Sequence, residues 1–136
     1  MNQAKLLNRK QGFTIIELII VATFAGLLFL SFIIQKSNFD ALSRDEDRKT
    51  AINAIYYALE ESYYKEHNYY PENISESVIT VIDPALWTDP SGYNLGDPKS
   101  SYSYEPADCD NGKCQKYILK ADLEKEATYV KTNRNK

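Results

Sequence analysis

Residues 13–34, FTIIELIIVATFAGLLFLSFII, decide the architecture of this 136-residue chain. These 22 residues contain one charged side chain, Glu17. At about 1.5 Å per residue, a helix of this length reaches ~33 Å, enough to cross a bilayer core of ~30 Å. From residue 37 onward the chain is polar, with 12 basic and 18 acidic side chains and a net charge of −6. The sequence therefore predicts a membrane-spanning N-terminal helix that carries one acidic head domain.

The residues before the apolar run indicate its orientation. Lys5, Arg9 and Lys10 lie in residues 1–12, which contain no acid, and a short basic stretch stays on the cytoplasmic side. A cleaved secretory signal peptide is the competing interpretation, but its apolar region has about 7–15 residues and ends in a small-residue cleavage site. This run is longer, and residues 32–36, FIIQK, offer no such site. We therefore expect the apolar helix to be retained.

Glu17 is the anomaly of the apolar run. An acid within a spanning helix costs up to ~2.5–3.5 kcal/mol at mid-depth and less near an end, and such residues usually have a partner. The simpler alternative is that Glu17 sits near the interface, where it reaches water or stays protonated.

The stretch Gly12-Phe13-Thr14-Ile15-Ile16-Glu17 resembles the class III leader of type IV prepilins and pseudopilins. That family has a short basic leader ending in Gly, then a Phe, a Glu four residues beyond the Phe, and a long apolar helix. The resemblance covers about the first 36 residues closely and the rest of the chain only in layout.

The resemblance implies that prepilin peptidase cuts between Gly12 and Phe13 and methylates the new amino group of Phe13. It also implies an inner-membrane assembly platform and a homo-oligomeric helical filament as partners. The precursor would be a single-pass protein of the cytoplasmic membrane, and the filament would be extracellular or periplasmic. The freed Phe13 amine, with an unperturbed pKa of ~8, would be cationic at neutral pH. We interpret Glu17 as the assembly residue that pairs with this amine on a neighbouring subunit, since either charge alone in lipid is costly.

The helix is predicted to continue over about residues 39–64, because apolar side chains recur at steps of three and four. These are Ile52, Ile55, Tyr56, Leu59 and Tyr63. The charged stretch 45–49, DEDRK, is interpreted as a solvated face, with charge matching between packed subunits as the alternative. Pro71 is predicted to stop the helix.

The C-terminal third is predicted to form strands around a hairpin. In residues 102–106, Tyr102, Tyr104 and Pro106 alternate with polar residues, and residues 116–121 are a compact apolar run. Between these two stretches, Asn111-Gly112 is a strong two-residue turn signal. Cys109 and Cys114 then face each other across the strands, so we predict a disulfide that contributes about 2 kcal/mol; two free thiols or a redox pair are the alternatives. Residues 78–82 are predicted as a short strand or extended edge and 128–130 as a last edge strand, with 131–136 as a polar tail.

The predicted fold class is α+β, in a layout that resembles the pilin lollipop: one long helix, half in the membrane and half packed under a small antiparallel sheet. Its predicted parts are a leader (1–12), a transmembrane and assembly helix (13–36), the soluble half of the helix (37–70), and a variable loop with the C-terminal sheet (71–136).

The sequence offers no candidate catalytic or cofactor site. It has no nucleophile with a base, no phosphate-binding glycine loop and no metal cluster, and His67 is expected at the surface. We therefore predict a non-enzyme without a cofactor.

Direct nucleic-acid binding is not evident, because phosphates attract basic rather than acidic domains. Asp83, Asp89 and Asp97 lack the spacing of a calcium loop, which leaves calcium a weak possibility. Asn73-Ile74-Ser75 fits the N-glycosylation pattern, mostly a chance match in a bacterial chain.

Three functions follow from these observations. The first is a structural filament subunit serving adhesion, motility, DNA uptake or, as a major pseudopilin, secretion. The second is a monomeric membrane-anchored binding domain, and the third an anchored enzyme. Gly12 and Glu17 favour the first, because a plain anchor needs neither.

Overall fold

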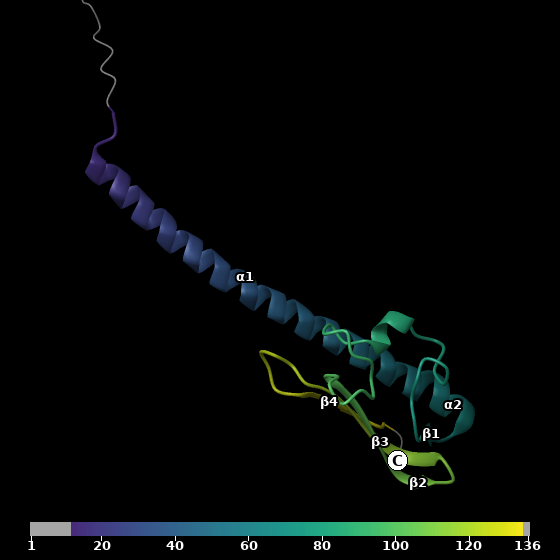
Figure 1. Cartoon of the computed structure of the whole chain (residues 1–136). Coiled ribbons are helices and arrows are strands. Elements are labelled where there is room, and N and C mark those ends of the chain that lie inside the picture. Colours follow the sequence, from purple (N-terminus) through teal and green to yellow (C-terminus); the bar gives the residue numbers. More distant parts are fainter. Residues whose placement is uncertain (1–11, 135–136) are drawn as a thin grey trace, which may run out of the picture. The chain divides into compact units, whose positions relative to one another are not determined.

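The structure is a computed structural model that describes residues 12–134. One long helical segment comprises α1 (Ile15–Tyr57), the π-helix η1 (Ala58–Tyr63) and α2 (Tyr64–His67), followed by a four-stranded antiparallel sheet (Figure 1). The predicted α+β class, with a long N-terminal helix packed against a small antiparallel sheet, is confirmed. The chain divides into two compact units, Met1–Asn38 and Phe39–Lys136, and we call the second unit the head.

The helical segment ends at His67, four residues before Pro71, the predicted stop. Asn68 adopts a left-handed conformation with φ 60°, and its N–H donates to the Tyr64 carbonyl at 2.8 Å. An asparagine tolerates this conformation, which ends the helix in the manner of a C-terminal cap. The prediction that Pro71 stops the helix is therefore wrong, because Pro71 already lies in strand β1 (Tyr70–Pro71).

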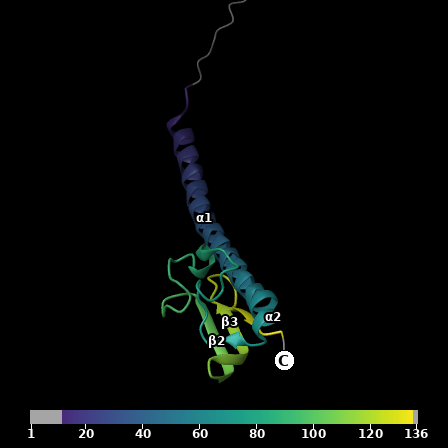
Figure 2. The ribbon, with the colours of Figure 1, turned by 90° about the vertical axis from the view of Figure 1, so that its right-hand side faces the viewer.

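The sheet is built around β3. The long strands β2 (Tyr102–Asp110) and β3 (Lys113–Ala121) pair along their length, and β1 and β4 (Tyr129–Thr132) pair with β3 as well. Residues 118–121 of β3 pair with both β2 and β4, so these two strands lie on opposite edges of the sheet (Figure 2). The predicted last strand exists, but it extends to Thr132, so Lys131 and Thr132 are not tail residues as predicted.

The turn between β2 and β3 matches its sequence signal. Asn111 and Gly112 have φ of 50° and 77°, and Asp110 pairs with Lys113 across the turn. Both turn residues need positive φ in this type of hairpin, which explains the Asn-Gly pair. The hairpin prediction is confirmed.

The core of the head lies between the second half of the helix and the sheet. The helix contributes side chains at steps of three and four, and Ile52, Ile55 and Leu59 have no exposed surface. The sheet contributes Tyr70, Tyr102, Tyr117, Leu119 and Ala121. The predicted stripe is confirmed for the three aliphatic residues, while Tyr56 and Tyr63 are partly buried against the core.

The connector, residues 72–100, contains no long strand. The predicted strand at 78–82 is wrong: the N–H groups of Val78 and Ile79 both donate to the Ser75 carbonyl and close a turn. Ile79 points into the core, whereas Val81 is 62% exposed. Packing and turn hydrogen bonds therefore override the preference of β-branched residues for strands. A short 3₁₀-helix, η2 (Pro84–Trp87), follows and buries Trp87 in the core.

Candidate functional site

The described part of the first unit is an apolar helix that is exposed along its length. Every residue from Gly12 to Asn38 is exposed, including Ile15 at 82% and Phe24 at 65%. By length and composition this helix could cross a membrane. Water disfavours so large an exposed apolar surface, so a lipid or protein environment must cover it.

The predicted cleavage site precedes the helix. Gly12 and Phe13 are exposed and lie outside regular secondary structure, and α1 begins at Ile15. Thr14 caps the helix: its hydroxyl accepts the Glu17 N–H at 3.3 Å, and its carbonyl accepts the Leu18 N–H at 3.1 Å. The predicted basic leader, with Lys5, Arg9 and Lys10, lies outside the described residues apart from Gly12.

Glu17 therefore occupies the third position of the helix, three residues after the cap. The pattern Thr-x-x-Glu is that of a capping box, in which the acid also favours the positive end of the helix dipole. The structure contains the hydrogen bond from the Glu17 N–H to Thr14. This cap uses the backbone of Glu17, so the Glu17 carboxylate contributes to it only through its negative charge near the positive end of the helix dipole.

The polar side chains of residues 13–34 differ in whether they find hydrogen-bond partners within their own helix. The hydroxyls of Thr23 and Ser31 donate to carbonyls one turn back in their own helix, Ile19 at 2.8 Å and Leu27 at 3.0 Å. Such bonds let hydroxyl groups enter an apolar environment without an outside partner. The Glu17 carboxylate makes no hydrogen bond or ion pair with any residue in the range 12–134. Of the polar side chains described in this span, the Glu17 carboxylate is the one without a partner among residues 12–134.

The charged stretch at 45–49 is only partly solvated. Asp45 and Arg48 are 1% and 4% exposed, so the prediction of a solvated face is wrong for them. Arg48 binds Asp45 at 2.8 Å and Glu124 at 2.9 Å, and its Nε donates to Ser101 at 3.2 Å. The Asp45 carboxylate also accepts the N–H groups of Glu124 and Lys125, at 2.8 and 2.9 Å. These bonds attach the segment after β3 to the helix.

The cluster shifts the pKa values of its acids downward. Burial by itself raises the pKa of Asp45, but the hydrogen bonds from Glu124, Lys125 and Arg48 outweigh it, and the pKa lies below its usual value. Hydrogen bonds from Arg44 and Arg48 lower the pKa of Glu124 to about 2. Both carboxylates are therefore charged at neutral pH, and the cluster is an ionic attachment inside the head.

A second buried acid, Glu60, was not predicted. It lies in η1 and is 3% exposed, and the hydroxyls of Tyr70 and Tyr117 donate to it at 3.1 and 2.8 Å. The backbone N–H of Arg134 donates to the same carboxylate at 3.1 Å. Burial and Glu60 raise the pKa of Tyr117. In the sequence, the one sign that Glu60 is buried is its spacing: it follows Tyr56, a member of the predicted apolar stripe, by four residues.

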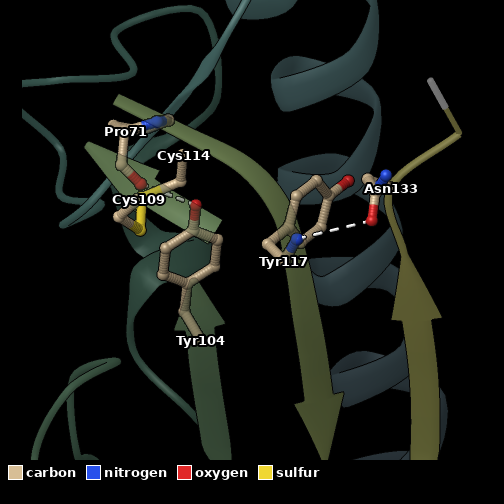
Figure 3. The surroundings of a disulfide bond; sticks show 6 residues. All are labelled: Pro71, Tyr104, Cys109, Cys114, Tyr117 and Asn133. Carbon is tan, nitrogen blue, oxygen red and sulfur yellow. Dashed lines mark hydrogen bonds between the residues drawn. A yellow bond between two sulfur atoms is a disulfide. The ribbon is translucent and has the colours of Figure 1, made fainter. Parts of the chain in front are cut away.

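The predicted disulfide between Cys109 and Cys114 is present, with their Cα atoms 3.9 Å apart (Figure 3). Cys114 has no exposed surface and pairs with Tyr70 of β1, while Cys109 is exposed. Beside the bridge, the Tyr104 hydroxyl donates to the Pro71 carbonyl at 2.7 Å (Figure 3). The bridge therefore fastens the hairpin at the point where β1 also joins it.

The three aspartates weighed for calcium act as turn caps. Asp83, Asp89 and Asp97 accept backbone N–H groups of their own loops, and Asp89 also binds the Ser101 N–H and hydroxyl at 2.8 and 2.9 Å. Among the described residues, no three His, Cys, Asp or Glu side chains are grouped to hold a metal. His67 is exposed, as predicted, and stacks on Tyr63 with ring centroids 4.3 Å apart.

Comparison with known protein families, with curated proteins and with solved structures finds no match to this chain.

Proposed function

We propose that the chain is a structural subunit of a type IV pilus-like filament, cut after Gly12 and polymerised through its apolar N-terminal helix. The observation that carries this proposal is the Glu17 carboxylate, which has no partner among the described residues on a helix whose hydroxyl groups are satisfied internally. A subunit interface supplies the missing partner, and a plain anchor does not.

The partner is the amino group that cleavage creates on Phe13 of an adjacent copy. Phe13 is 77% exposed and lies outside the helix, so its bond to Gly12 is reachable by a peptidase. Before cleavage Phe13 carries an uncharged amide, so the uncut precursor cannot make the pair. Assembly would therefore depend on cleavage, because an unpaired acid in lipid is costly.

The head supports the same proposal through its disulfide. Disulfides persist in oxidising compartments outside the cytoplasm, where the head of such a filament would lie. The ionic cluster at Asp45 and the hydrogen bonds to Glu60 attach the sheet to the helix, so that a polymer of helices carries ordered heads.

The test is the Glu17→Gln variant, because glutamine keeps the size of the side chain and the backbone N–H that binds Thr14, and removes only the charge. We expect mass spectrometry to find an N-methylated Phe13 in both the wild type and the variant, and the yield of sheared filaments to fall about tenfold in the variant. Thr23→Ala is the matched control, since Thr23 bonds to its own helix. It should assemble normally.

Normal filaments from Glu17→Gln would refute the charge pairing. Electron microscopy with an antibody to the head would then locate the wild-type protein. Labelled surface filaments would indicate a pilus, and short filaments confined to the periplasm a pseudopilus. Dispersed membrane label with residues 1–12 retained would refute the proposed function.

A further inference from the structure

The tip of the β2–β3 hairpin exposes a reactive pair of residues. Asn111 and Gly112 are both exposed, and both have positive φ. The side-chain amide of Asn111 donates to the Asp110 carboxylate at 3.0 Å, and within residues 12–134 this neighbour is its only hydrogen-bond partner. The amide is therefore held only by the residue next to it.

The backbone nitrogen that follows this amide is accessible as well. The Gly112 N–H makes no hydrogen bond with any group in the described part of the chain. Glycine also has no side chain that would shield its nitrogen. Asparagine is a thermolabile residue, and it reacts when the next backbone nitrogen attacks its side-chain carbonyl carbon.

A carboxylate from another part of the head lies beside the same glycine. A methyl group added to Gly112 would lie 3.9 Å from Glu72 Oε2, which places this carboxylate next to the turn. Glu72 is there because Pro71 of β1 pairs with Lys113 at the start of β3. Glu72 is exposed and joins no ion pair within residues 12–134. Its carboxylate can therefore accept a proton from the Gly112 nitrogen, directly or through one water molecule.

We propose that Asn111 is a site of spontaneous deamidation, promoted by the Glu72 carboxylate. The Gly112 nitrogen loses its proton and bonds to Cγ of Asn111, the Cγ–Nδ2 bond breaks, and the nitrogen leaves as ammonia with a proton returned to it. The product is a five-membered succinimide ring. Solvent water then adds to one of the two ring carbonyls and opens the ring, which gives aspartate or isoaspartate.

Either product changes the hairpin tip. Both replace a neutral amide by a carboxylate next to Asp110, and isoaspartate also adds one carbon to the main chain. The Cys109–Cys114 bridge and the pairing of Asp110 with Lys113 hold a turn of two residues, so a longer main chain must distort that turn. The tip of an aged molecule therefore differs in charge and backbone from that of a new one. This inference concerns the head alone and is independent of the proposed filament function.

The test follows the full chain in detergent micelles at neutral pH over several weeks. After reduction and alkylation, trypsin releases peptide 100–113, whose only asparagine is Asn111. Mass spectrometry detects the exchange of ammonia for water, and an isoaspartyl methyltransferase labels isoaspartate. We expect Asn111 to convert several times faster than Asn73, which is also exposed but is followed by the bulky Ile74. Conversion at Asn111 no faster than at Asn73 would overturn the inference.

Glu72→Gln tests the carboxylate, with Glu76→Gln, an exposed acid of the same connector, as the matched control. We expect the rate at Asn111 to fall about tenfold in Glu72→Gln, because the proton acceptor is lost, and to stay unchanged in Glu76→Gln. In guanidinium chloride the wild type and Glu72→Gln should convert equally fast, since unfolding separates Glu72 from Gly112. Equal rates in the folded proteins, or a difference that persists in guanidinium chloride, would overturn the role of Glu72.

Discussion

Replacing Asp45 by alanine should destabilise the head by about 3–5 kcal/mol, the cost typical of breaking a buried ion pair on one side. Asp45 is 1% exposed and receives the Arg48 guanidinium and the N–H groups of Glu124 and Lys125. The substitution leaves those two N–H groups without their acceptor, and an unsatisfied buried donor costs about 1–3 kcal/mol. Arg48 keeps Ser101 and Glu124, which limits the loss.

For a domain of about 100 residues, such a loss lowers Tm by more than about 10 °C. The assay is thermal unfolding of the full chain in detergent micelles, followed by near-ultraviolet circular dichroism. All 11 tyrosines and Trp87 lie in the head, so this signal reports the head and not the apolar helix. Urea unfolding followed by the same signal gives the free energy.

Asp47→Ala is the matched control. Asp47 is an exposed neighbour on the same helix and joins no ion pair within the described part of the chain, so the change should be under about 0.5 kcal/mol. Asp45→Asn keeps one acceptor oxygen, so its loss of stability should lie between those of Asp45→Ala and Asp47→Ala. A loss below about 1 kcal/mol for Asp45→Ala would refute the view that this cluster attaches the segment after β3 to the helix.

Two further predictions concern pH and the disulfide. The pKa values of Asp45, Asp89 and Glu124 are lowered in the folded head, so their contribution to stability is complete above the unfolded pKa and is lost as pH falls through the folded one. The urea midpoint should therefore hold steady above about pH 5 and fall toward pH 2, and a midpoint independent of pH over that range would contradict the assignment. The double variant Cys109→Ala/Cys114→Ala should unfold with about 2 kcal/mol less free energy and an unchanged fluorescence emission spectrum of Trp87, since the bridge closes only a short loop. A changed spectrum before unfolding would mean that the bridge shapes the sheet as well as the hairpin.

Local patterns in the sequence were sufficient to predict most of the fold. The apolar stripe at 52, 55 and 59 predicted the buried face of the helix, and Asn111-Gly112 predicted both the hairpin and the register that brings Cys109 to Cys114. These signals act over a few residues, where backbone sterics and side-chain periodicity decide the outcome. The strand predicted at 78–82 failed because a turn at Ser75 and the burial of Ile79 outweighed local preference.

By itself the sequence determined an apolar helix with one internal acid, a polar acidic head and a cysteine pair across a tight turn. Tertiary structure alone decided which charges are buried. Asp45 and Arg48 belong to a run that looks solvated, yet the backbone after β3 meets them from about 80 residues away in the chain. Glu60 is likewise satisfied by tyrosines of the sheet and by the C-terminal backbone. The physical reason is that a buried charge is stable only when several donors converge on it, and the donors here come from distant segments that folding brings together.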